Sequence, residues 1–128
     1  MKERAAELRA EGKKGAKKAD GLQAVLDAIA KMGPEDRELA ERVHVAVTGT
    51  APDLAPKTWY GMPAYAKDGK VVCFYKPAEK FNSRYATFGF EEAANLDQGA
   101  MWPTSYALTE LTAGDEKKIG ALVKKAAR

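Results

Sequence analysis

Apolar residues recur at helical spacing in three stretches of the chain, and a middle part follows a different pattern. The first stretch predicts a helix from Asp20, the expected N-cap, to Met32, and the second predicts a helix over 34–48. The third predicts a last helix that begins after Thr112. The three apolar stripes consist of Leu22, Val25, Leu26 and Ile29, of Leu39, Val43 and Val47, and of Ile119, Leu122, Val123 and Ala126.

Residues at the expected helix ends support these boundaries. Gly33 suits the C-terminal cap of the first helix, and Pro34 suits the first position of the second. Thr112 and Asp115 have the spacing of a capping box, in which each residue's side chain binds the other's backbone amide. Basic residues gather at the end of the last helix, where they complement its dipole.

From Lys57 onward the chain is rich in aromatic and β-branched residues and in turn pairs, a pattern typical of strands. Asp68-Gly69 predicts a tight turn that joins two strands as a hairpin. In the next strand Ala86, Phe88 and Phe90 alternate with polar residues, so they share one apolar face. The expected elements of this part are strands over 64–67, 70–75 and 84–90, a short helix over 91–96, and a strand over 106–111.

The element order is therefore α-α-β-β-β-(α)-β-α. It predicts an α+β fold, a two-layer sandwich with helices packed on one face of a mostly antiparallel sheet. A chain of 128 residues fits one domain. We expect the domain over 20–128 and a basic arm, partly helical or flexible, over 1–19.

The positive charge of the chain belongs to this arm. The net charge is +3; residues 1–20 hold seven of the 21 Lys and Arg residues and four of the 18 Asp and Glu residues, which leaves 14 of each sign for 21–128. Binding to nucleic acid or another acidic surface is therefore expected only through the arm. The lysines that would carry it are Lys13, Lys14, Lys17 and Lys18.

The single cysteine and the absence of long apolar runs predict the compartment. Cys73 cannot form an internal disulfide, which favours a reducing environment. No apolar run approaches the roughly 20 residues that cross a bilayer. We therefore expect a cytoplasmic protein that does not enter the membrane, as a monomer or a homodimer.

Catalytic signatures are weak, so the sequence favours a protein that is not an enzyme, although acid–base chemistry stays open. The only histidine, His44, lies on the second predicted helix, and no serine motif or Cys-His pair accompanies it. Cys73 alternates with apolar residues along a strand, as a buried thiol does. No nucleotide-binding glycine motif occurs, and no cofactor is expected.

Aromatic residues are unusually dense between 59 and 106. Most are expected in the core, but Trp59-Tyr60-Gly61-Met62-Pro63 and Met101-Trp102-Pro103 are typical of loops or strand ends, where large rings line ligand pockets. We therefore expect a small molecule or a protein partner to bind there. The candidate residues are Trp59, Tyr60, Met62, Tyr65, Arg84 and Trp102. Arg84, Lys76 and Lys80 flank the third strand, where they form either an anion-binding element or a solvated strand edge.

The same segments resemble a known family. Residues 59–65, the Asp68-Gly69 turn with the strand after it, 84–90 and 101–104 are similar to the YdhG-like family of bacterial domains of unknown function. The resemblance covers about 20–127 and implies a frataxin-like α+β sandwich.

Some YdhG-like proteins are described as iron chaperones, so the resemblance makes iron binding an alternative function. The acidic residues that could hold iron in this chain are on the second predicted helix, where arginines are interleaved with them and a solvated helix face is the competing explanation. They are Glu35, Asp36, Glu38 and Glu41.

Overall fold

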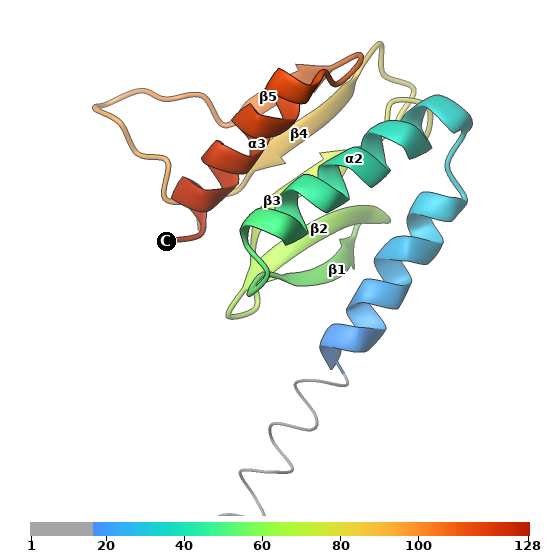
Figure 1. The fold of residues 1–128 in the computed structure, drawn as a ribbon, viewed down its shortest axis with the longest axis horizontal. Coiled ribbons are helices and arrows are strands. Elements are labelled where there is room, and N and C mark those ends of the chain that lie inside the picture. Colours follow the sequence, from blue (N-terminus) through green and yellow to red (C-terminus); the bar gives the residue numbers. More distant parts are fainter. Residues whose placement is uncertain (1–16) are drawn as a thin grey trace, which may run out of the picture.

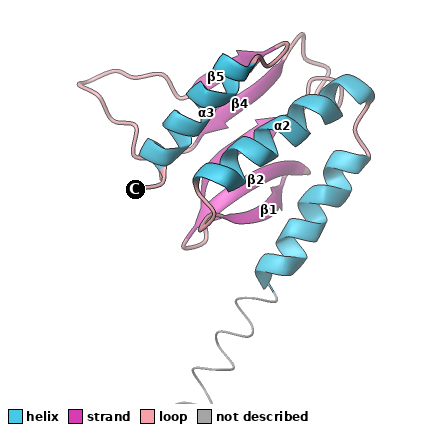
Figure 2. Ribbon diagram, in the orientation of Figure 1, coloured by secondary structure: helices cyan, strands magenta, loops and turns pink. Residues whose placement is uncertain are grey.

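Three helices lie on one face of a five-stranded antiparallel sheet in the computed structural model, which describes residues 17–128 (Figure 1). This arrangement confirms the predicted α+β class with helices packed against the sheet. The strands follow one another in space in sequence order, and every neighbouring pair is antiparallel (Figure 2). They are β1 (Ala55–Trp59), β2 (Met62–Lys67), β3 (Lys70–Lys76), β4 (Ala86–Phe90) and β5 (Ser105–Leu108).

Two tight turns set the register of the first three strands. Tyr60-Gly61 joins β1 to β2 and Asp68-Gly69 joins β2 to β3, and all four residues have positive φ angles. Two consecutive positive φ values define a type I′ turn, whose twist matches that of the paired strands. The predicted hairpin at Asp68-Gly69 is confirmed. β1 is an additional strand, because the predicted order contained four.

The helices match the predicted stripes in part: in the first stripe Val25 and Ile29 are buried, whereas Leu22 and Leu26 are exposed. A first helix is described from residue 17 and ends at residue 30; α2 spans Pro34–Thr50 and α3 spans Ala113–Ala126. Pro34 opens α2 as expected, and Thr112 and Asp115 form the predicted capping box of α3. The stripe of Leu39, Val43 and Val47 is buried.

Two predicted caps are wrong. Asp20 is not an N-cap, because residues 17–19 are already helical. Lys17, Lys18 and Ala19, which were assigned to the arm, have high helix propensity and belong to the first helix. Gly33 has φ −62° and is the N-cap of α2, not a left-handed C-terminal cap of the first helix.

The segment between β4 and β5 also differs from the prediction. Residues 91–96 form turns, not a helix, because their amides bind partners that a helix would not supply. Glu91 donates to the carbonyl oxygen of Val72 on β3, and Asn95 donates to that of Ala126 at the end of α3. The last strand ends at Leu108, not at Leu111.

The core lies between the helices and the inner face of the sheet. Tyr65, Tyr75 and Phe88 are its largest fully buried side chains, and they meet valines of the helices. The predicted face of Ala86, Phe88 and Phe90 is buried here. The helices therefore cover only one side of the sheet, and Figure 1 shows all of them on that side.

The first helix packs against the edge strand β1 through a glycine. A Cβ atom at Gly21 would lie 2.1 Å from the carbonyl oxygen of Pro56 and 3.8 Å from the Cα atom of Lys57. Only a residue without a side chain allows the helix backbone to approach the strand backbone this closely. Within residues 17–128, none of the helices combines the length and apolarity needed to cross a bilayer.

Candidate functional site

The outer face of the sheet carries the most unusual group of side chains. Strand register places Lys57, Ala64, Phe74, Gly89 and Ser105 in one row across all five strands, on the side opposite the helix-facing Tyr65. Lys76, Thr87 and Ala107 continue the next row, and Trp59 and Met62 pair at its β1–β2 end. Neither row contains an acidic residue.

Three aromatic rings follow one another at the β1–β2 end of this face. The ring centroids of Phe74 and Trp59 are 5.3 Å apart, and those of Trp59 and Tyr60 are 5.0 Å apart. The Phe74 ring lies over Gly89, where a Cβ atom would be 2.3 Å from Cζ of that ring. A side chain at position 89 would therefore displace Phe74.

Two lysines and a fourth ring extend the series. Nζ of Lys80 donates a hydrogen bond to the carbonyl oxygen of Gly61, 3.2 Å away in the turn that carries Tyr60. The same ammonium group is 5.7 Å from the centroid of Phe81, and Nζ of Lys76 is 5.2 Å from it. We call this series the aromatic–lysine strip: Phe74, Trp59, Tyr60, Lys80, Phe81 and Lys76.

Tyr60 has the most unusual conformation in the strip. It is 77% exposed and has φ 52°, a left-handed conformation that suits Gly or Asn and disfavours a bulky side chain. The chain therefore holds a large ring in water at a turn position where Asn would be more stable. Backbone strain that folding does not require is found most often at functional sites.

A hollow of about 610 Å³ opens beside Trp59. Lys57 and Lys70 contribute positive charge to its lining, and Glu91 and Glu92 contribute negative charge. The lysines come from β1 and β3, and the two glutamates follow β4 in the sequence. The hollow thus extends the strip with polar groups of both signs.

The structure brings together only some of the residues predicted to bind a ligand. Trp59, Tyr60 and Met62 meet at the β1–β2 turn, although Met62 is buried beneath this surface. Tyr65, also predicted to bind a ligand, is not part of this surface, because its side chain faces the helices and is fully buried. The period-two alternation of a strand puts it opposite its neighbour Ala64.

The other two predicted residues lie elsewhere. Trp102 is half-buried in the β4–β5 loop, where it packs on the core and lines a separate hollow with Phe90 and Leu96. The guanidinium carbon of Arg84 is 5.1 Å from the ring centroid of Tyr85. Trp59 and Trp102 thus line two different hollows.

Sequence reasoning missed Phe74 and Phe81 as site residues. Phe74 alternates with Cys73 and Tyr75, so the face it occupies follows once one strand neighbour is known to be buried. Phe81 lies in the β3–β4 connection and has no periodic pattern around it. Its flanking Lys76 and Lys80, already singled out as an anion-binding element, were the available signal.

His44 and Cys73, the two residues considered for nucleophilic chemistry, both lie next to Tyr65, between α2 and the sheet. The Tyr65 hydroxyl and Nδ1 of His44 are 2.7 Å apart, and burial lowers the pKa of His44. Burial, together with the nearby Cys73 charge, raises the pKa of Tyr65. Cys73 pairs with Tyr65 across β2 and β3, and burial raises the pKa of its thiol to about 12. A thiol with so high a pKa is a poor nucleophile at neutral pH.

The four acidic residues predicted as a cluster on α2 do not lie together: one is buried and three are exposed. Asp36 is 6% exposed, and its two carboxylate oxygens accept hydrogen bonds from the backbone amides of Ala78 and Glu79, at 3.1 and 3.0 Å. Both oxygens are therefore occupied by the chain itself. The other three acids, Glu35, Glu38 and Glu41, are exposed, and residues 17–128 contain no group of three or more potential metal ligands in reach of one ion.

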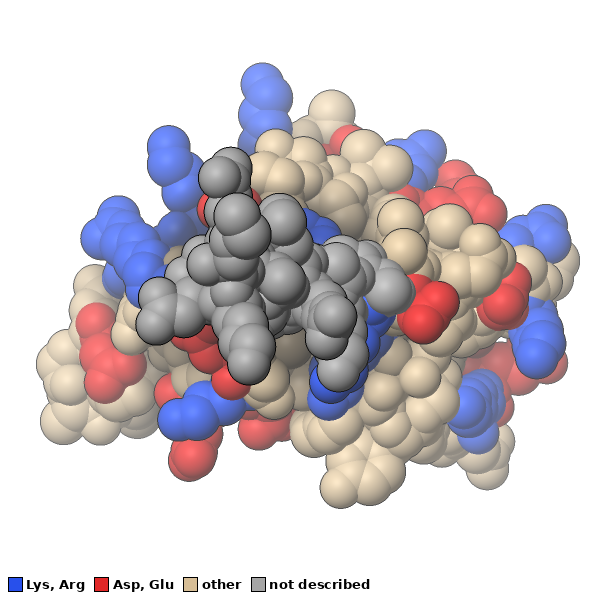
Figure 3. Space-filling model, turned by 90° about the horizontal axis from the view of Figure 1, so that it is seen from below, with Lys and Arg blue, Asp and Glu red and all other residues tan. Residues whose placement is uncertain are grey.

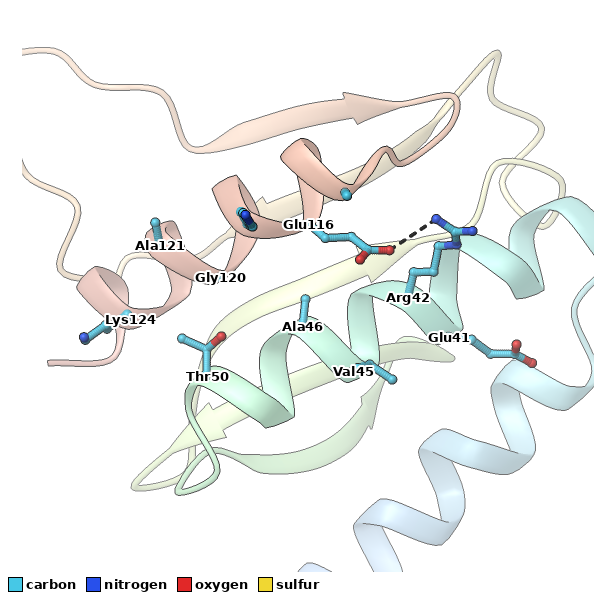
Figure 4. Close-up of a pocket in the computed structure, with 11 residues that line it drawn as sticks. Glu41, Arg42, Val45, Ala46, Thr50, Glu116, Gly120, Ala121 and Lys124 are labelled. Carbon is cyan, nitrogen blue, oxygen red and sulfur yellow. Dashed lines mark hydrogen bonds and ion pairs between the residues drawn. The ribbon is translucent and has the colours of Figure 1, made fainter.

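A third hollow, of about 680 Å³, lies between α2 and α3 (Figure 4). Small residues line it between the two helices, among them Ala46 and Gly120. Arg42 and Glu116 form a 3.2 Å ion pair from one helix to the other, and Arg42 also donates to the carbonyl oxygen of Leu111. The Arg42–Glu116 pair thus joins the two helices across this groove.

Charge on one further face of the molecule is mixed. Figure 3 shows Lys and Arg side chains interspersed with Asp and Glu on the face seen from below. Of the arm lysines, Lys18 donates to the carbonyl oxygen of Pro52 at 2.9 Å, and Lys17 is exposed. Lys13 and Lys14 lie outside the described residues.

Comparison of the chain with family models, with curated proteins and with solved structures yields no match. The resemblance to the YdhG-like family stays a prediction.

Proposed function

We propose that this protein is a small binding module that holds planar ligands on the outer face of its sheet, through the aromatic–lysine strip. The observation that carries the proposal is Tyr60, a ring 77% exposed in a left-handed conformation beside the Trp59–Phe74 pair. Exposed aromatic rings gain free energy when another flat, apolar group stacks on them. The proposal assigns no reaction to the chain.

The strip offers more for recognition than packing alone would require. Tyr60 makes no contribution to the core, yet it occupies a turn position that disfavours its side chain. Phe81, at 36% exposure, has two ammonium groups over its ring. Rings next to cations bind ligands that combine a π system with negative charge.

The test is a titration of the ¹⁵N-labelled full chain with planar probes: adenosine monophosphate, flavin mononucleotide and indole-3-acetate. We expect at least one probe to shift the indole resonance of Trp59 and the amides of residues 60, 74 and 81. The indole of Trp102 serves as the internal control and should not move. Saturating probe concentrations that leave the strip unchanged, or shifts centred on Trp102 instead, would contradict the proposal.

A further inference from the structure

We infer that the ligand class of the aromatic–lysine strip is single-stranded nucleic acid, with bases stacked on its rings and phosphates on its lysines. This inference rests on the proposed function and names its ligand. Proteins that bind single strands without sequence preference combine stacking rings with a basic track for the backbone.

The order of groups along the strip fits a polymer better than a small ligand. Contacts run from Phe74 to Trp59 at 5.3 Å and from Trp59 to Tyr60 at 5.0 Å. They continue through the Gly61 carbonyl to Lys80 at 3.2 Å and from there to Phe81 at 5.7 Å. A single planar molecule would cover one or two of these rings, whereas successive bases of one strand can use all four.

The strip itself carries positive charge. None of the three ion pairs among residues 17–128 involves Lys57, Lys76 or Lys80. The two rows of outer-face positions include Lys57 and Lys76 and no acid. Lys76 and Lys80 therefore make none of these ion pairs, and the nearest acids line the hollows at the two ends of the strip: Glu91 and Glu92 beside Trp59, and Glu79 beside Lys80.

The shape of the face favours unpaired over paired strands. The neighbours of Phe74 in its row, Ala64 and Gly89, are small and buried, and the Phe74 ring lies over Gly89, so the face offers ring surface and no groove deep enough for a duplex backbone. A duplex keeps its bases stacked inside and would offer only phosphates to the rings. Splayed bases of a single strand expose the π faces that the rings can meet.

The test measures the fluorescence anisotropy of a labelled single-stranded oligonucleotide of about 12 nucleotides, a length within the span of small sheet-based sites. The full chain is used at low salt, with DNA and RNA versions of one mixed sequence and the matching duplex. We expect saturable binding of the single strands, weaker binding of the duplex, and a slope of log K against log salt of about −2, from three phosphate contacts.

Variants decide which residues bind. Trp59→Ala should weaken binding about tenfold, as the loss of one stacked base does. Tyr60→Asn should do the same and is compatible with the turn, so it tests the strip even if Trp59→Ala does not fold. The controls are Trp102→Phe and Lys124→Glu, which change a ring and a charge outside the strip and should leave affinity within about twofold.

The same experiment separates the strip from the basic arm. If Lys13→Ala with Lys14→Ala abolishes binding while Tyr60→Asn does not, the arm carries the interaction and the inference is overturned. Absence of binding to any single strand also overturns it. If planar probes or a proline-rich peptide still shift Trp59, the proposed binding module stands with another ligand class; if they do not, both proposals fail.

Discussion

The hydroxyl group of Tyr65 lies 2.7 Å from Nδ1 of His44, so a side-chain hydrogen bond joins strand β2 to helix α2. Tyr65 is fully buried and His44 is partly buried. In the tautomer with its proton on Nε2, Nδ1 of His44 accepts a hydrogen bond from the Tyr65 hydroxyl group, which thereby has a partner in the core. The bond fixes the distance between the two layers at a point where apolar packing alone would leave a hydroxyl without a partner.

This pair predicts a pH dependence of stability that comes from one residue. Burial lowers the pKa of His44 in the folded state, whereas the unfolded chain takes up a proton near pH 6.5. The unfolded state therefore binds more protons, and stability is lost as the pH falls below about 6.5 until the folded-state pKa is passed. Urea denaturation at about pH 7.5 and about pH 5.5 should show the loss.

The control variant for this prediction is His44→Gln, whose amide oxygen can still accept the Tyr65 proton. Because the chain has one histidine, the variant should keep its stability over the same pH interval apart from the small contribution of carboxylates. A wild-type protein and a variant with equal pH dependence would show that His44 does not carry the effect.

Asp36 predicts a large stability effect at a position that looks like surface charge. Asp36→Ala would leave the amides of Ala78 and Glu79 without their acceptor, at a cost of about 2 kcal/mol or more in the free energy of unfolding. Glu38→Ala is the matched control, because Glu38 is exposed and its 3.4 Å pair with Arg42 is worth about 0.5 kcal/mol or less. Similar losses in urea denaturation for both variants would contradict the role given to Asp36.

Two helical glycines predict effects of opposite sign. Gly21→Ala places a Cβ atom against the Pro56 carbonyl, which backbone cannot easily avoid, so we expect destabilisation by about 1–3 kcal/mol. At Gly49, near the end of α2, nothing lies within 4 Å of the added atom, and Gly49→Ala should stabilise by up to about 1 kcal/mol through helix propensity. Thermal unfolding measures both. A gain at both positions would show that the first helix does not depend on close contact with β1.

The sequence predicted elements where one local rule dominates. The turn at Asp68-Gly69 and the buried stripe of α2 could be predicted from neighbouring residues alone, without knowledge of the tertiary structure. β1 was harder because Pro56 argues against a strand; proline is tolerated there because β1 is an edge strand with a free side. The segment 91–96 has helix-forming residues, but tertiary hydrogen bonds to Val72 and Ala126 determine its path.

The candidate site was predictable only in part, for a related reason. The sequence identified Trp59 and Tyr60 as rings at a strand end, and both lie on the outer face or its edge. It could not tell which strand face the helices cover, so Tyr65 was grouped with them although it is buried. The alternation fixes which residues share a face, but only the packing of α2 on Tyr65 fixes which face is inside.

Tyr60 predicts a conflict between stability and binding. Asn is the preferred residue at the first central position of a type I′ turn, whereas Tyr at φ 52° is disfavoured by about 1 kcal/mol. Tyr60→Asn should therefore raise the free energy of unfolding by up to about that amount, since the 77% exposed ring contributes little packing. The same variant should lose the response of Trp59 to planar probes.

The two measurements, urea denaturation and probe titration, are informative together because a purely structural ring and a ligand-binding ring give different results. If Tyr60 served only the fold, its loss would lower stability and leave the probe response of Trp59 intact. A control at the second turn, Asp68→Asn, keeps the same turn geometry at φ 51° at the opposite end of β2 from Tyr60 and should change neither quantity by much. A more stable protein with weaker binding would mean that selection has kept a strained aromatic residue for its exposed surface.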